Sequence, residues 1–157
     1  IASAKKSILI TNPYFIPDEV MTDALVKAAD RGVRVVILTP GTIDNRFTYT
    51  ASRSHYGSLL LGGVEVFEYK AAFMHAKTIV VDGIWATIGS TNIDNRSFAL
   101  NQEINLTVHA SAVARRLEEI FWEDLKYSEP VTYEQWRSRG VFERLFVFFS
   151  FPIREQL

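Results

Sequence analysis

The sequence contains no cysteine, no long apolar run and almost no net charge: 17 basic and 18 acidic residues leave −1 over 157 positions. Without cysteine, disulfides and thiolate zinc sites are excluded. The balanced charge provides no overall basic field of the kind that sequence-independent nucleic-acid binding needs, so we expect no nucleic-acid partner. No apolar stretch approaches the roughly 20 residues of a membrane-spanning helix.

What is present is an ordinary globular composition, with 48% hydrophobic and 22% charged residues. This length is enough for one domain with a substantial core. The chain opens with IASAKKSILITNPYF and has no initiator methionine. Residues 1–6 have the small and basic side chains of the last turns of a helix that runs into a strand. We therefore expect the chain to be a piece of a longer protein.

Apolar runs alternate with amphipathic stretches along most of the chain. The early strand–helix–strand–helix–strand order favours parallel strands with helices on both faces, and a later hairpin adds antiparallel pairing. We predict a three-layer α/β/α fold with a mixed, mostly parallel central sheet over residues 1–130, followed by a C-terminal helical tail over 131–157. Strands are expected at 7–11, 33–39, 64–69 and 102–108, and helices at 18–31, 45–61, 111–127 and 132–139.

The chemically informative stretch is residues 74–92, MHAKTIVVDGIWATIGSTN. In an extended strand, positions i and i+2 share a side, so His75 and Lys77 present an imidazole and an ammonium together. The Asp-Gly pair at 82–83 predicts a two-residue hairpin turn. The returning strand, 84–88, would then carry Ser90 and Asn92 back beside His75 and Lys77.

This set of side chains suits a phosphodiester. Imidazole can attack phosphorus to give a phosphohistidine, or can protonate the leaving alcohol. Lys77 is a fixed cation for the non-bridging phosphate oxygens, and Asn92 can donate an N–H to the same oxygens. Ser90 either helps to bind phosphate or satisfies backbone groups at the strand end. No carboxylates or histidines have metal-ligand spacing, so we expect neither a metal nor another cofactor.

The pattern His75-x-Lys77-x4-Asp82 followed by Gly-Ser90-x-Asn92 resembles the HKD signature of the phospholipase D superfamily. The segments TNPYFIPDE, GVEVFEYKAAFMHAK and GSTNIDNRSFALNQE resemble the second catalytic half of bacterial cardiolipin synthases. This resemblance implies a metal-free phosphatidyltransferase with phosphatidylglycerol as its substrate. It also implies a His75 that works opposite a second histidine as general acid–base, although the residues themselves leave nucleophile and acid open.

Two carboxylates belong to the predicted catalytic set. Asp82 is equally well interpreted as a hairpin residue or as a catalytic group, and we assign it support of the site rather than bond-making. Glu103 lies 28 positions after His75. A glutamate near this spacing resembles the superfamily carboxylate that orients the catalytic imidazole. The alternative is an exposed glutamate on an edge strand.

Only one HKD pattern is present, and one imidazole cannot both attack phosphorus and protonate the oxygen leaving on the far side. The chain alone is therefore expected to be inactive, and to need a missing N-terminal half or a second copy of itself. Two alternatives are a homodimeric phosphodiesterase or nuclease and a non-catalytic lipid-binding domain. The resemblance implies work at a bacterial cell membrane. The apolar tail with flanking arginines can face a membrane surface or a partner.

Overall fold

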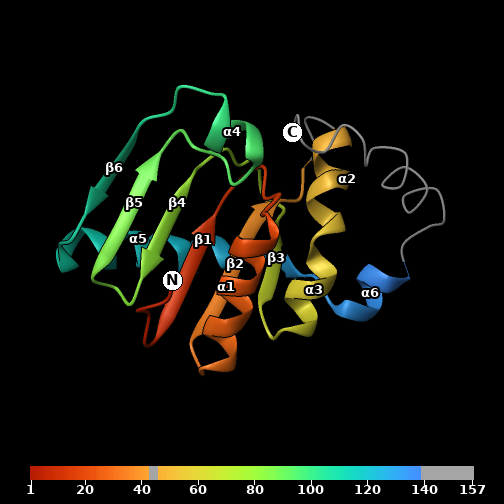
Figure 1. Cartoon of the computed structure of the whole chain (residues 1–157), viewed down its shortest axis with the longest axis horizontal. Helices are drawn as coiled ribbons and strands as arrows, with labels where there is room; N and C mark the ends of the chain where they lie inside the picture. The colour runs from red at the N-terminus through yellow and green to blue at the C-terminus, as the bar shows by residue number, and fades with distance from the viewer. Residues whose placement is uncertain (43–45, 139–157) are drawn as a thin grey trace.

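The computed structural model describes residues 1–42 and 46–138, and its centre is a seven-stranded sheet (Figure 1). The strand order is β6-β5-β4-β1-β2-β3-β7. The strands are β1 Ser7–Thr11, β2 Arg34–Pro40, β3 Glu65–Tyr69, β4 Thr78–Val81, β5 Trp85–Gly89, β6 Asn105–Val108 and β7 Ser128–Pro130. The helices are α1 Glu19–Asp30, α2 Arg46–Ser54, α3 Tyr56–Leu61, α4 Asn95–Ala99, α5 Ser111–Leu125 and α6 Tyr133–Arg137.

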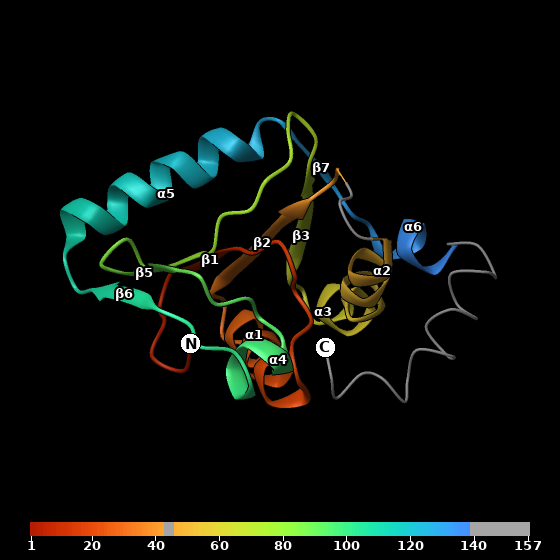
Figure 2. The ribbon, with the colours of Figure 1, turned by 90° about the horizontal axis from the view of Figure 1, so that it is seen from above.

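The elements form the three layers predicted from the sequence. Figure 2 shows α5 alone on one face of the sheet, with α1, α3 and α4 on the other. Each face carries its own apolar cluster, because successive side chains of a strand point to opposite sides. Ile8 and Ile10 of β1 join the cluster under α1 and α3, whereas Leu9 joins Phe121 in the cluster under α5. The central strands are therefore buried on both faces.

The sheet is mixed as predicted, but the expectation that it is mostly parallel is wrong. Only β1–β2 and β2–β3 pair in parallel. The pairs β1–β4, β4–β5, β5–β6 and β3–β7 are all antiparallel. The reason is that neighbouring parallel strands need a crossover connection, and helical crossovers join neighbouring strands only for β1–β2 and β2–β3. After β3 the chain forms β4, β5 and β6 as antiparallel neighbours, and α5 then carries it across the sheet to β7 on the opposite side.

The first crossover helix matches its prediction closely. The Asp18 side chain caps α1 by accepting a hydrogen bond from the Met21 amide at 2.7 Å. Gly32 follows the helix with φ +85°, a left-handed conformation that ends helices and that glycine adopts without steric cost. The second predicted helix, over 45–61, is instead two helices separated at His55. The two helices have different partners, since α3 buries Tyr56 and Leu59 in the core while α2 makes polar contacts.

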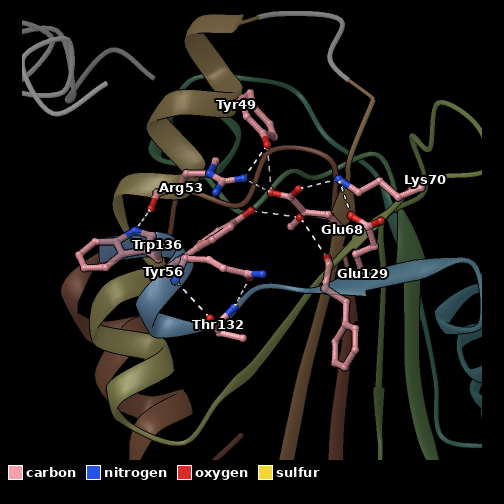
Figure 3. A network of polar contacts seen from close by, with 11 residues as sticks. Tyr49, Arg53, Tyr56, Glu68, Lys70, Glu129, Thr132 and Trp136 are labelled. Atoms are coloured by element: carbon pink, nitrogen blue, oxygen red, sulfur yellow. Dashed lines mark hydrogen bonds and ion pairs between the residues drawn. The ribbon is translucent and has the colours of Figure 1, made fainter. Parts of the chain in front are cut away.

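These polar contacts centre on Glu68, a buried carboxylate near the end of β3 (Figure 3). Its Oε1 atom accepts from Arg53 at 2.6 Å and from the Tyr49 hydroxyl at 3.1 Å, and its Oε2 atom accepts from Lys70 at 3.0 Å. A buried carboxylate is stable only when its charge is paired in this way. The network therefore fixes α2 against the sheet.

Two short elements close the described fold. β7, which was not predicted, pairs antiparallel with β3 and places Pro130 opposite Phe67 on an edge strand, where proline is tolerated. α6 begins with a capping box between Thr132 and Gln135. The Trp136 indole donates to the Arg53 carbonyl at 2.6 Å, so residues up to 138 of the predicted tail pack on the main fold. Residues 139–157, which hold the rest of that tail, lie outside the described part of the chain.

Candidate active site

The strand directions bring the predicted site segments to one edge of the sheet. β1 ends at this edge, and β4 runs antiparallel to it, with Thr11 opposite Thr78. The residues just before β4 therefore lie beside the residues just after β1. β5 returns antiparallel to β4, and β6 is antiparallel to β5 with Gly89 opposite Asn105. The end of β5 and the start of β6 thus reach the same edge as His75.

The β4–β5 hairpin brings the segment that follows β5 beside Lys77, as the sequence predicts. The Gly89 amide donates to the Lys77 carbonyl at 3.1 Å, which sets Ser90 next to Lys77. The turn differs in detail from the prediction. Val81 pairs with Trp85, so residues 82–84 form a three-residue connection, and the Ile84 amide donates to the Val81 carbonyl at 3.1 Å. The strand β5 accordingly starts one residue later than expected.

His75 is exposed at this edge, between two aromatic rings. The Tyr14 ring lies 5.7 Å from the imidazole, centroid to centroid, at 86°, and the Phe73 ring lies 5.6 Å away at 45°. The Lys77 ammonium donates to the His75 carbonyl at 3.0 Å. The ammonium and the residue that carries the imidazole are therefore held together, and the imidazole is accessible from outside.

Lys77 is half-buried, and its burial lowers its pKa. The negative charges of Glu103 and Asp94 oppose this effect and favour the ammonium form. Asp94 in turn caps α4 through the Ser97 amide at 2.6 Å, and burial raises its pKa. The ammonium of Lys77 is thus favoured by the negative charges of two carboxylates near the same edge of the sheet.

Glu103 is bound to the end of β5. One oxygen accepts from the Ser90 hydroxyl in a short hydrogen bond, and the other accepts from Asn101 at 3.3 Å. The bond from Ser90 is the main reason why the pKa of Glu103 is lowered. The Ser90 hydroxyl also accepts from the Ile104 amide at 3.0 Å. These contacts favour a supporting role for Ser90, and the predicted orientation of His75 by Glu103 stays a prediction.

Asn92 follows Ser90 on the same segment and is half-buried. Its Oδ1 atom is buried and has no hydrogen-bond partner among the described residues. The peptide groups on both sides of it are fixed, however, because the side chain of Asn12 binds the Thr91 carbonyl and the Ile93 amide. The amide of Asn92 is thus placed by its backbone, and its predicted role as a phosphate donor stays a prediction.

Asp82 lies at the opposite edge of the sheet from His75, in the hairpin turn. Its carboxylate accepts from the backbone amides of Lys5 at 2.9 Å, Lys6 at 2.7 Å and Ser7 at 2.9 Å. Partial burial alone would raise the pKa of Asp82, but these three hydrogen bonds outweigh it and lower the pKa. Asp82 therefore fixes the start of β1 to the hairpin, and its predicted support of the site stays a prediction.

His75 and Ser90 are exposed, and the other predicted site residues are half-buried. A groove of about 590 Å³ lies elsewhere, between the start of α1, α3 and α4, and is lined by ten residues that include Asp18, Asp23 and His55. None of the predicted site residues lines it.

Within the described part of the chain, no helix is long and apolar enough to cross a bilayer.

Two residues at this edge were not predicted, namely Asn12 and Tyr14. Both follow β1, and they contact the segments 91–93 and 75 from the other end of the sequence. Sequence reasoning treated them as part of a loop. A polar residue directly after a buried central strand is a usable signal, because the ends of such strands often carry functional groups.

The family model and two curated relatives that match this chain are all described as cardiolipin synthases. Residues 1–125 match the family model described as "Cardiolipin synthase, PLD-like domain". The chain is 43% identical over 145 residues to a cardiolipin synthase of Clostridium perfringens strain SM101. It is 45% identical over 145 residues to the major cardiolipin synthase ClsA of Bacillus subtilis strain 168. Each match covers 92% of this chain but only 30% of the relative.

Solved structures show the same fold at lower identity. The phospholipase D family member Nuc of Salmonella typhimurium superposes with a TM-score of 0.73 at 23% identity, over 83% of this chain and 85% of Nuc. The phosphatidylserine synthase of Haemophilus influenzae Rd KW20 superposes with a TM-score of 0.71 at 14% identity, over 99% of this chain and 42% of that enzyme. The mixed seven-stranded sheet is therefore a fold shared with both.

Proposed function

Because the chain belongs to the family of cardiolipin synthase phospholipase D-like domains, we propose that it supplies one of two histidine-bearing halves of a phosphatidyltransferase. The single observation that carries this proposal is the family match over residues 1–125, which includes the edge where His75, Lys77, Ser90 and Glu103 meet. The chain spans about 30% of the length of the curated relatives it matches, so it corresponds to a part of such an enzyme.

The reaction that fits these groups is a two-step phosphoryl transfer without a metal. In the first step one imidazole forms a bond to phosphorus of phosphatidylglycerol, and the second imidazole protonates the glycerol oxygen as the P–O bond breaks. In the second step a hydroxyl of another phosphatidylglycerol gives its proton to that second imidazole and attacks phosphorus, and the bond between phosphorus and the first imidazole breaks. The products are cardiolipin and glycerol. We assign His75 the general acid–base role.

The arrangement around His75 supports this chemistry. Burial lowers the pKa of Lys77, while the charges of Glu103 and Asp94 favour its ammonium form, and the ammonium donates to the His75 carbonyl. A fixed cation near the phosphorus stabilises the charge that builds on the non-bridging oxygens. The half-buried amide of Asn92 adds a donor of the same kind. These groups can bind one face of a phosphate.

A second half would complete the site. His75 is exposed, so a phosphate bound to it can also contact a group from elsewhere. We propose that a second histidine comes from another part of the same polypeptide. A second copy of this chain is the alternative source, and it would make the protein a homodimeric phosphodiesterase.

Apolar side chains beside the site favour a lipid substrate over a nucleic acid. Five exposed apolar residues lie on α4, β5, β6 and the loop that follows α4, the elements next to Ser90 and Glu103 in the sequence: Ile88, Phe98, Leu100, Ile104 and Leu106. Ile88 pairs with Leu106 across the strands, and the Ile104 carbonyl accepts from the Ser90 amide at 3.0 Å. We call these five residues the apolar rim. Exposed apolar groups beside a phosphate site suit a diacylglycerol, and they support action at a bacterial membrane surface.

Substrate choice tests the proposal. The enzyme with both halves is incubated with vesicles of labelled phosphatidylglycerol, and cardiolipin and free glycerol are quantified. In parallel, hydrolysis of DNA and of a soluble phosphodiester is followed. We expect cardiolipin and glycerol in equal amounts.

Hydrolysis of DNA by a dimer of the isolated chain, without phosphatidyl transfer, would overturn the proposal in favour of the phosphodiesterase. Vesicle binding without turnover of any diester would favour a non-catalytic lipid-binding domain instead.

A further inference from the structure

Asn12 is a buried asparagine, 2% exposed, directly after β1. Its side chain makes three hydrogen bonds to backbone groups. The Oδ1 atom accepts from the amides of Tyr14 and Ile93, each at 3.2 Å, and the Nδ2 atom donates to the Thr91 carbonyl at 3.3 Å. A buried amide whose bonds all go to backbone fixes that backbone, because any displacement leaves a buried polar group unpaired.

Two of these bonds fix the position of Asn92. The Thr91 carbonyl and the Ile93 amide are the groups on either side of residue 92, and a single side chain holds both. A further contact strengthens this connection, since the Ile16 amide donates to the Ile93 carbonyl at 2.7 Å. The direction in which the Asn92 side chain leaves the backbone is therefore set by the loop after β1.

The third bond connects the same asparagine to His75. It orders the backbone at Tyr14, and the Tyr14 ring lies edge-on to the imidazole at 5.7 Å and 86°. Phe73 contacts the imidazole at 45° from its own segment. Edge-to-face contacts of this kind restrict the orientation of an aromatic ring. One short loop thus controls both the proposed phosphate donor and the imidazole.

We propose that Asn12 and Tyr14 are positioning residues, which hold Asn92 and His75 at a fixed separation around the phosphate. The catalytic part of this inference rests on the proposed function. The physical reason is that catalytic groups must stay within a fraction of an ångström of their productive positions, and small displacements cost rate rather than substrate affinity.

The test combines kinetics with a measurement that needs no activity. Four variants are compared: Asn12→Ala, Asn12→Asp, Tyr14→Ala and Tyr14→Phe. Asn12→Asp keeps the acceptor for the two amides and replaces the donor to Thr91 with an oxygen, and circular dichroism checks that each variant is folded before its kinetics are compared. In the enzyme with both halves we expect kcat for phosphatidyl transfer to fall about 10–100-fold in Asn12→Asp and Tyr14→Ala, with KM changed less than about three-fold. Tyr14→Phe keeps the ring and should retain kcat within about three-fold.

The second readout is the NMR spectrum of the His75 imidazole in the 157-residue chain, which has only three histidines. Tyr14→Ala is expected to shift the His75 ring resonances, and Tyr14→Phe to leave them close to wild type. Tyr127→Ala, at an exposed tyrosine that follows α5, is the matched control and should leave them unchanged.

Unchanged His75 resonances in Tyr14→Ala would overturn the role of Tyr14, whatever the enzyme's substrate proves to be. A rise in KM with unchanged kcat in Asn12→Asp would overturn the role of Asn12. If the wild-type enzyme shows no phosphatidyl transfer at all, the proposed function fails, and the NMR comparison still decides whether Tyr14 positions His75.

Discussion

Replacing Asp82 with asparagine should lower stability while leaving catalysis nearly intact. Oδ1 of Asp82 accepts two backbone amides, those of Lys6 and Ser7, and Oδ2 accepts one, that of Lys5. Asparagine keeps the first oxygen but turns a donor toward the Lys5 amide. It also tolerates the left-handed backbone, φ 55°, better than alanine would.

The expected loss of stability follows from the three hydrogen bonds that Asp82 accepts. One lost hydrogen bond and two bonds that change from charged to neutral acceptors amount to about 2 kcal/mol, which solvent exposure reduces to about 1–2 kcal/mol. For a chain of this length we expect the melting temperature to fall by roughly 3–6 °C. Chemical and thermal denaturation at neutral pH measure this directly.

The dependence on pH provides a second check. The folded-state pKa of Asp82 lies below the ordinary value of 3.8, so its carboxylate stabilises the fold above that value. This stabilisation is lost as the pH falls through the lowered folded-state pKa. The difference between wild type and Asp82→Asn should therefore be constant near neutral pH and shrink below about pH 4.

The control is Asp23→Asn, which removes only an exposed ion pair with Lys27 at 3.9 Å. The reasoning is refuted if Asp82→Asn is as stable as wild type. It is also refuted if the variant, fully folded at low temperature, loses kcat by orders of magnitude, since that would make Asp82 part of the chemistry.

Three further outcomes are expected. Glu68→Gln breaks the ion pairs with Arg53 and Lys70 and should lower the free energy of unfolding by about 3–5 kcal/mol, measured by urea denaturation; most of this loss belongs to Arg53, the more buried cation. Glu103→Gln removes a negative charge that raises the pKa of Lys77. Lys77 should then lose its proton at lower pH, so the alkaline limb of the kcat–pH profile should move to lower pH. Leu106→Ser should raise KM for phosphatidylglycerol vesicles several-fold and leave hydrolysis of a soluble diester unchanged, because it removes only exposed apolar area.

Much of the fold could be predicted because local patterns determine it. β1, α1 and α5 have clear apolar periodicity, and their predicted limits agree with the structure within two residues. The hairpin was visible in the Asp-Gly pair that follows β4. Elements too short for periodicity were missed: α4 has five residues and β7 has three. Pro130 of β7 also indicated the end of the preceding helix rather than a strand, although an edge strand tolerates proline.

Longer-range contacts explain the remaining errors. Nothing local indicates that the carboxylate of Asp82 reaches the start of β1, 75 to 77 positions earlier. The bonds from Asn12 to the segment after β5 span 79 and 81 positions. The strand order decides such contacts, and the order was only partly predicted, since the sheet is more antiparallel than expected. The grouping of His75, Lys77 and Ser90 was predictable because one hairpin brings them together.

We propose above all that the imidazole of His75 takes part in phosphatidyl transfer. The most direct measurement is cardiolipin formation from labelled phosphatidylglycerol by the enzyme with both halves, comparing wild type with His75→Asn at equal amounts of folded protein. We expect a loss of at least about a thousand-fold in kcat, because no other described side chain replaces the proton transfer. Cardiolipin formation at the wild-type rate by His75→Asn would contradict it.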